Sequence, residues 1–245
     1  MKLACLLLLV CGGCLASEHK HWSYNGDTDP AHWANLEGDF KTCSTGKNQS
    51  PIDIRHEAVH DADLPPLQFA YQPAPLRIID NGHTIQVIYA PGSFLTVGGK
   101  RYELVQFHFH HPSEEKIDGK GHEMVAHLVH KDADGKLAVV AVLLDAGDAN
   151  AMVNTLWAHL PAVKEKEMVD AAASINVADL LPKDHSYYSF TGSLTTPPCT
   201  EGVSWFVLRQ PGNVSSQQVA EFARHYPMNA RPVQPLNGRE VRASR

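Results

Sequence analysis

Short segments in which hydrophobic and polar residues alternate run through the middle of this chain, with glycine-containing turns between them. Such alternation is the pattern of β-strands that have one buried face. Short strands joined by tight turns are typical of an antiparallel meander. We therefore predict five consecutive strands, at residues 83–90, 93–97, 101–110, 123–131 and 136–144.

Two later segments follow the helical period instead, at residues 148–161 and 215–227. Asp148 can cap the first helix, and a serine can cap the second. No internal repeat or low-complexity linker divides the chain. The pattern predicts a predominantly β (α+β) fold: one domain over residues 17–245, with a large, mostly antiparallel twisted sheet and a few peripheral helices. The apolar positions with helical spacing are Met152 or Val153, Leu156, Trp157 and Leu160 in the first segment, and Val219, Phe222, Ala223 and Tyr226 in the second.

The first residues have a basic start, an apolar run and a small-residue end, which is the pattern of a secretory signal peptide. Cleavage after Ala16 makes residues 1–16 the signal peptide, and lipoprotein processing before Cys14 is the alternative. No later apolar run is long enough to cross a bilayer. We expect an exported protein, periplasmic or secreted, that is a monomer or a homodimer.

Composition adds few restrictions beyond this. Hydrophobic residues make up 43% of the 245 and charged residues 20%, as in ordinary globular proteins. A formal net charge of -6 gives no sign of nucleic-acid binding. Cys5, Cys11 and Cys14 leave with the signal peptide, or Cys14 becomes a lipid anchor, and Cys43 and Cys199 remain. In an exported protein such a pair indicates one disulfide, and two buried free thiols are the alternative.

The 15 histidines are the unusual count, and their spacing decides what they do. On a strand, His108 and His110 point to one face, and Phe107 and Phe109 point to the other. An H-x-H pair alone is often incidental. The following predicted strand places His127 where it can face the pair across the ladder.

Three neutral imidazoles without a thiolate suit zinc, and three protein ligands leave one coordination position open for catalysis. The same alternation turns His111 and His130 away from this face, and we interpret these two and His122 as structural or surface residues.

Nearly all of the mature chain is covered by the motifs "HWSY", "HW" at His32, "NQSPIDI", "DNGHTI", "QFHFHHPSE", "AHLVH", "GSLTTPPCTEGVSW" and "NARPVQPLN". Together these motifs resemble the alpha-class carbonic anhydrases, of the exported bacterial type. The resemblance implies a Zn²⁺ enzyme that hydrates carbon dioxide reversibly to bicarbonate and a proton, with esterase activity as a possible side reaction. It implies a small-molecule substrate and no nucleic-acid partner.

The resemblance also implies roles for single residues. His108, His110 and His127 match the zinc ligands, and Gln106 matches the residue that orients the first of them. Thr195 looks like the hydroxyl that orients the attacking hydroxide and donates a hydrogen bond to a glutamate, which Glu114 matches. His83 resembles the proton shuttle, for which an ordinary histidine pKa near 6.5 is well suited. Tyr24 matches the tyrosine of the solvent network, and the substrate-pocket positions are Gln86, Val129, Val139, Leu194, Thr196, Val203 and Trp205.

Two positions depart from the family pattern. The family usually has a glutamate two residues before the third zinc ligand, where it orients that imidazole, and here the residue is Val125. A histidine is common where this chain has Glu115. We therefore expect a water or a backbone carbonyl to accept the second N–H of His127, and zinc to be held more loosely than in relatives that have the glutamate. Two rival functions, a non-catalytic binding protein and a histidine-rich metal buffer, fit less well, because all three ligands are present at fixed positions.

Overall fold

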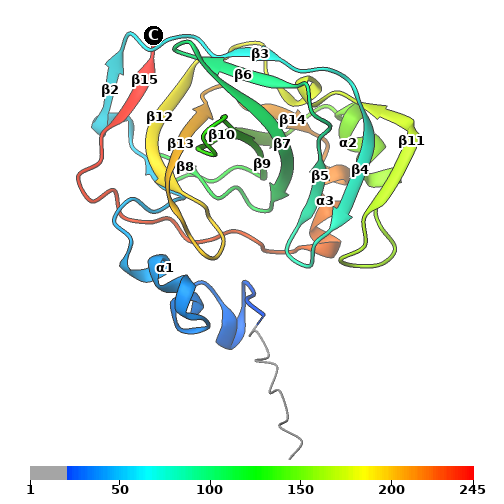
Figure 1. The fold of residues 1–245 in the computed structure, drawn as a ribbon, viewed down its shortest axis with the longest axis horizontal. Helices are drawn as coiled ribbons and strands as arrows, with labels where there is room; N and C mark the ends of the chain where they lie inside the picture. The colour runs from blue at the N-terminus through cyan, green and yellow to red at the C-terminus, as the bar shows by residue number, and fades with distance from the viewer. Residues whose placement is uncertain (1–20) are drawn as a thin grey trace, which may run out of the picture.

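The computed structural model describes residues 21–245. The predicted signal peptide, residues 1–16, lies outside the described residues. Within the described part, two sheets and a few short helices make up the fold (Figure 1). The smaller sheet pairs β1 (Asp53–Ile54) with β8 (Lys116–Ile117) in parallel. The strands of the larger sheet are β2 (Val59–Ala62), β3 (Gln68–Ala70), β4 (Ala74–Asp80), β5 (Ile85–Ile88), β6 (Phe94–Val97), β7 (Lys100–His110), β9 (Met124–Lys131), β10 (Leu137–Ala146), β11 (Met168–Ile175), β12 (Tyr187–Ser193), β13 (Glu201–Leu208), β14 (Gly212–Val214) and β15 (Val241–Ser244).

The larger sheet has 13 strands, and its main path runs β11-β4-β5-β7-β9-β10-β13-β12-β15-β2. Among its pairs only β10 with β13, β10 with β14, and β15 with β2 are parallel, so the predicted mostly antiparallel sheet is confirmed. The predicted meander is correct except at β6. That strand does not pair with β5; the two pair with successive parts of β7 instead. The Pro91–Gly92 pair interrupts the extended chain between them, and Gly92 has the positive φ of 111° that glycine tolerates best.

The helices are α1 (Thr42–Thr45), α2 (Ala151–Ala158) and α3 (Ser216–His225), and the last two are those predicted. Asn150 caps α2, not Asp148 as predicted, because its side-chain oxygen accepts the Val153 N–H at 3.1 Å. Ser215 caps α3 in a capping box with Gln218, an arrangement worth about 1 kcal/mol. No helix in residues 21–245 is long and apolar enough to cross a membrane.

The two faces of the sheet bury different groups. Phe107 and Phe109 of β7 lie in the larger apolar core, against which α2 and α3 pack. On the other face, Val125, Val139 and Trp205 belong to a second apolar cluster. Full burial of each large apolar side chain contributes roughly 1.5–3 kcal/mol. The second face is therefore apolar around the position where the histidines of β7 emerge.

The N-terminal segment folds over this second face around a buried tryptophan. Trp33 is fully buried, and its indole N–H donates to the Ser23 carbonyl at 2.8 Å. Its ring contacts those of Trp22 and Tyr24 edge to face. In Figure 1 this segment, with α1, lies apart from α2 and α3. Five 3-10 helices complete the described chain: Gly26–Thr28, Trp33–Asn35, Gly38–Lys41, His56–Ala58 and Val177–Leu180.

Candidate metal centre

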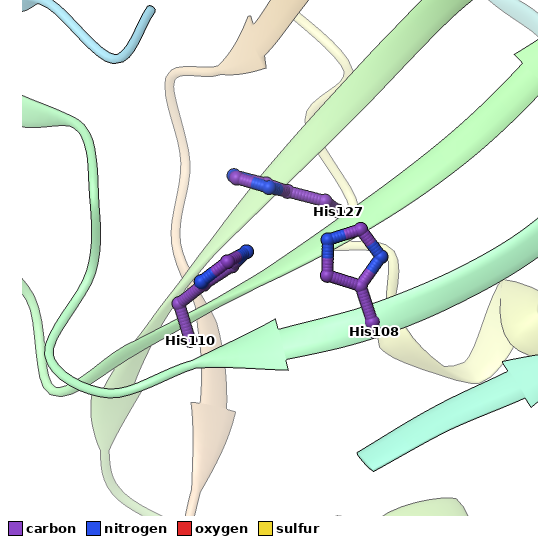
Figure 2. A group of neighbouring side chains, drawn as sticks. All are labelled: His108, His110 and His127. Carbon is purple, nitrogen blue, oxygen red and sulfur yellow. The ribbon is translucent and has the colours of Figure 1, made fainter. Parts of the chain in front are cut away.

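Two neighbouring strands bring the three predicted zinc ligands together. In the antiparallel pair of β7 and β9, His108 lies directly opposite His127, and His110 lies opposite Val125. Strand alternation puts His108 and His110 on one face of β7 and the phenylalanines on the other. Figure 2 shows the three imidazole rings turned toward a common space.

The spacing of the three rings fits a single small metal ion. One ring nitrogen from each histidine lies within 4.8 Å of the others. The ring centroids are 5.0 Å apart for His108 and His110, 5.5 Å for His108 and His127, and 4.7 Å for His110 and His127. Zinc–nitrogen bonds of about 2.0–2.1 Å fit nitrogens at such separations after small adjustments of the rings.

Hydrogen bonds fix which nitrogen of the first two histidines faces this space. The Nδ1 of His108 lies 2.8 Å from the Gln106 side-chain oxygen, as the sequence predicted. The Nδ1 of His110 lies 2.7 Å from the Asn229 carbonyl oxygen. In each case Nδ1–H is the donor, which leaves Nε2 with a lone pair toward the centre. The Nε2 of His110 is buried and has no hydrogen-bond partner among the described residues, which suits a metal ligand.

The third histidine is held by a residue that the sequence reasoning did not identify. The Nε2 of His127 lies 3.1 Å and 3.3 Å from the two carboxylate oxygens of Glu115, so Nδ1 is the nitrogen that faces the centre. We predicted a water or a backbone carbonyl at this place, because Val125 cannot accept a hydrogen bond. That prediction is wrong, since Glu115 reaches the same nitrogen from the loop after β7.

The electrostatic environment keeps two of the three histidines neutral. Burial, then the neighbouring His127, lowers the pKa of His108 to about 3. The pKa of His110 is also lowered well below its usual value, again mainly by burial. Burial acts in the same direction on His127, but the carboxylates of Glu115 and Glu114 outweigh it, so the pKa of His127 is raised. Neutral imidazole is the form that binds a metal.

Glu114 is buried beside the centre-facing nitrogens of His110 and His127. Its Oε1 accepts the Arg231 backbone N–H at 2.7 Å, and its Oε2 lies 3.5 Å from His110 Nε2. Burial raises the pKa of Glu114 to about 7, against the opposing effects of His127, the Arg231 N–H and the Thr195 hydroxyl. Thr195 is itself buried at the edge of the centre.

A cavity of about 250 Å³ opens in front of the histidines. One side of it is apolar and the other is polar, and the two sides meet at the imidazoles. Val203 does not line it; that side chain packs in the second apolar cluster together with Trp205. Trp22, Asn81 and Thr84 also line the cavity, although the sequence reasoning assigned them no role. The predicted residues that line it are Tyr24, His83, Gln86, Gln106, His108, His110, His127, Val129, Val139, Leu194, Thr195, Thr196 and Trp205.

His83 is confined between two rings at the polar side of this cavity. Its imidazole stacks on Trp22 with the centroids 3.5 Å apart and the planes 5° from parallel, and on His21 at 4.7 Å. Burial lowers the pKa of His83 to about 4, and the electrostatic effects of His21 and Lys164 act in the same direction. This pKa lies below the ordinary value near 6.5 that suits a proton shuttle.

The remaining predicted structural histidines lie outside the centre. His130 is fully buried on the opposite face of β9, where its Nε2 lies 2.7 Å from the Tyr71 hydroxyl. His111 lies with its Nδ1 2.9 Å from the Pro227 carbonyl. His122 lies with its Nδ1 2.8 Å from an oxygen of Asp145.

Cys43 and Cys199 form a disulfide, which confirms the predicted pair. Hydrogen bonds connect both cysteines to the centre. Arg231 donates from its guanidinium to the Cys43 carbonyl at 2.8 Å, and its backbone N–H holds Glu114. Gln49 donates to the Cys199 carbonyl at 3.0 Å. The disulfide is consistent with an exported protein.

Comparison with known proteins places the chain in one family. Residues 28–245 match the family model of the eukaryotic-type carbonic anhydrases. The chain is 46% identical over 240 residues to the carbonic anhydrase of Pectobacterium carotovorum, covering 96% of each protein. It is similar to a hyperthermostable carbonic anhydrase from a hydrothermal vent chimney, with a TM-score of 0.88, 44% identity and coverage of 92% of this chain and 100% of the other. It is also similar to the alpha-carbonic anhydrase of Thermovibrio ammonificans, solved with the inhibitor sulfanilamide, with a TM-score of 0.87, 40% identity and coverage of 91% and 98%. The chain therefore belongs to the eukaryotic-type, or alpha, carbonic anhydrase family, and its enzyme class is that of the carbonic anhydrases.

Proposed function

We propose that the protein binds one zinc ion through His108, His110 and His127 and catalyses CO2 + H2O ⇌ HCO3− + H+. The observation that carries this proposal is the convergence of three imidazole nitrogens, each fixed by a hydrogen bond on the opposite side of its ring. Zinc held by three neutral imidazoles, with one open position, acidifies a bound water and so supplies hydroxide at neutral pH.

Thr195 and Glu114 orient the attacking oxygen in this proposal. In this proposal the Thr195 hydroxyl donates to the buried Glu114 carboxylate, whose other oxygen accepts the Arg231 N–H and whose pKa the Thr195 hydroxyl lowers. The Thr195 oxygen then faces the cavity as an acceptor only. Fixed in that role, it selects the orientation in which the lone pair of the attacking oxygen points at carbon dioxide.

The apolar side of the cavity receives carbon dioxide, which has no net dipole and little affinity for polar walls. Val129 and Val139 are paired neighbours on β9 and β10, and Trp205 follows on β13. Leu194 completes this wall, and Thr196 contributes a hydroxyl beside it. The polar residues opposite, Gln86 among them, contact water rather than the substrate in this proposal.

His83 carries the released proton toward solvent, and Tyr24 holds the water network through which the proton reaches His83. Burial, then Glu114, raises the pKa of Tyr24 well above its usual value, so that its hydroxyl stays protonated and can donate to that network. We also propose that the protein is exported to an oxidising compartment, where its disulfide persists, and that the same nucleophile hydrolyses activated esters slowly.

Alanine substitutions test the ligand set. His108→Ala, His110→Ala and His127→Ala should each lower zinc occupancy and abolish hydration, because two imidazoles hold the ion poorly. His111→Ala and His130→Ala are the matched controls and should retain zinc, since both side chains bond elsewhere. Metal content and stopped-flow hydration are measured on the same preparations. Loss of zinc in His130→Ala together with retention in His127→Ala would contradict the assignment.

A further inference from the structure

Glu115 is buried against the third histidine of the centre. Its side chain is fully buried, and both carboxylate oxygens lie within 3.3 Å of one nitrogen, the Nε2 of His127. A buried carboxylate is costly unless a donor compensates it. The contact is therefore the main compensation for Glu115 and, at the same time, the restraint on the ring of His127.

The backbone around Glu115 is fixed on both sides. The Ser113 hydroxyl donates to the Glu115 carbonyl at 2.8 Å and accepts the His122 N–H at 2.8 Å. The next residue, Lys116, begins β8, and its N–H donates to the Ile52 carbonyl at 3.3 Å. A carboxylate on such a segment is held in place before any metal arrives.

The strand that carries His127 cannot supply this contact itself. Val125 shares the face of β9 with His127, and it is fully buried in the second apolar cluster opposite Leu143 of β10. Its side chain has neither a donor nor an acceptor.

We propose that Glu115 is the positioning residue of His127. By accepting the Nε2–H, it holds the imidazole in the tautomer whose Nδ1 lone pair points to the other two ligands, and it slows the escape of the metal. The carboxylate that the family usually supplies from the strand is supplied here from the loop after β7. This inference rests on the proposed function, because it takes the bound metal to be zinc.

Metal release tests it directly. Zinc-loaded wild type, Glu115→Gln and Glu115→Ala are mixed with a chromogenic chelator at one pH, and the release rate is recorded. We expect release about 10–100-fold faster in Glu115→Ala, the usual range for loss of such a partner. Glu115→Gln should fall in between, since its amide oxygen still accepts the N–H without the charge. Glu123→Gln, an exposed glutamate just before β9, is the matched control and should release zinc like wild type.

A double variant distinguishes a carboxylate that positions His127 from a side chain that only fills the space beside it. Glu115→Ala/Val125→Glu returns the carboxylate to the strand and should recover slow release. Thermal unfolding of the metal-free proteins checks that each variant folds, and Glu115→Gln serves if Glu115→Ala does not. Release at the wild-type rate from both single variants would overturn the inference, and so would a double variant as fast as Glu115→Ala. Wild type that binds no zinc would defeat the proposed function instead, so the two failures are distinguishable.

Discussion

Removing the indole that covers His83 should increase the rate at which protons leave the site. Trp22 stacks on one face of this imidazole at 3.5 Å, and burial lowers the pKa of His83 to about 4. This pKa makes His83 too weak a base for an efficient shuttle, because a shuttle must take a proton from a donor that ionises near neutral pH. Trp22→Ala exposes the ring to water and should raise its pKa toward the ordinary 6.5.

The size of the effect follows from the two pKa values. At pH 7, a group of pKa about 4 is protonated in roughly one molecule in a thousand, and a group of pKa 6.5 in roughly one in four. The protonated fraction of His83 at pH 7 therefore rises about 240-fold at most. His21 still stacks on the His83 ring, and proton-transfer rates follow basicity only in part. We therefore expect kcat at low buffer to rise about three- to tenfold.

The assay is stopped-flow hydration at low and high buffer concentration, together with an NMR titration of His83. The kcat/KM for carbon dioxide should stay nearly unchanged, because proton export follows the chemical step. His83→Ala should lower kcat at low buffer, and added imidazole should restore part of it. The gain of Trp22→Ala should disappear in Trp22→Ala/His83→Ala. A His83 that titrates near 6.5 in wild type, or a Trp22→Ala variant with unchanged pKa and kcat, would refute this reasoning.

Two further predictions concern stability. The disulfide of Cys43 and Cys199 closes a loop of 156 residues, and its restriction of the unfolded chain stabilises the fold by about 5 kcal/mol. The double Cys→Ala variant should therefore unfold at a clearly lower denaturant concentration. An unchanged unfolding midpoint would contradict this. Burial lowers the pKa of His130 to about 4, so its contribution is fully present above pH 6.5 and is lost as the pH falls toward 4. His130→Gln should remove about 2 kcal/mol of the change in unfolding free energy between pH 7 and pH 4.5, as measured by denaturation at both pH values. An equal change in wild type and variant would argue against it.

Local periodicity was sufficient to predict that the three histidines converge, but not everything that holds them. The two-residue period of a strand determines that His108, His110 and Gln106 share a face, and the antiparallel pairing of β9 with β7 aligns His127 with them. A turn residue such as Glu115 has no such period. Its side-chain direction depends on how the loop after β7 packs against Ile52, which alternation along the sequence does not show.

Distance along the chain explains the other omissions. Asn229 and Arg231 reach His110 and Glu114 from more than 100 residues away. Both lie in the "NARPVQPLN" motif, which signalled the family without indicating which atoms would be used. The pKa of His83 is likewise a property of the packed rings around it, so the sequence could predict the residue but not its proton affinity.

The most direct test of the account is carbon dioxide hydration by one preparation of the wild-type protein as its zinc content is varied. The protein is stripped with chelator, zinc is returned in steps, and bound zinc and the stopped-flow rate are measured at each step. We predict that hydration disappears with the metal and returns in proportion to zinc, up to one ion per chain. A rate that does not depend on zinc content, or a fully loaded protein that is no faster than buffer, would contradict the account.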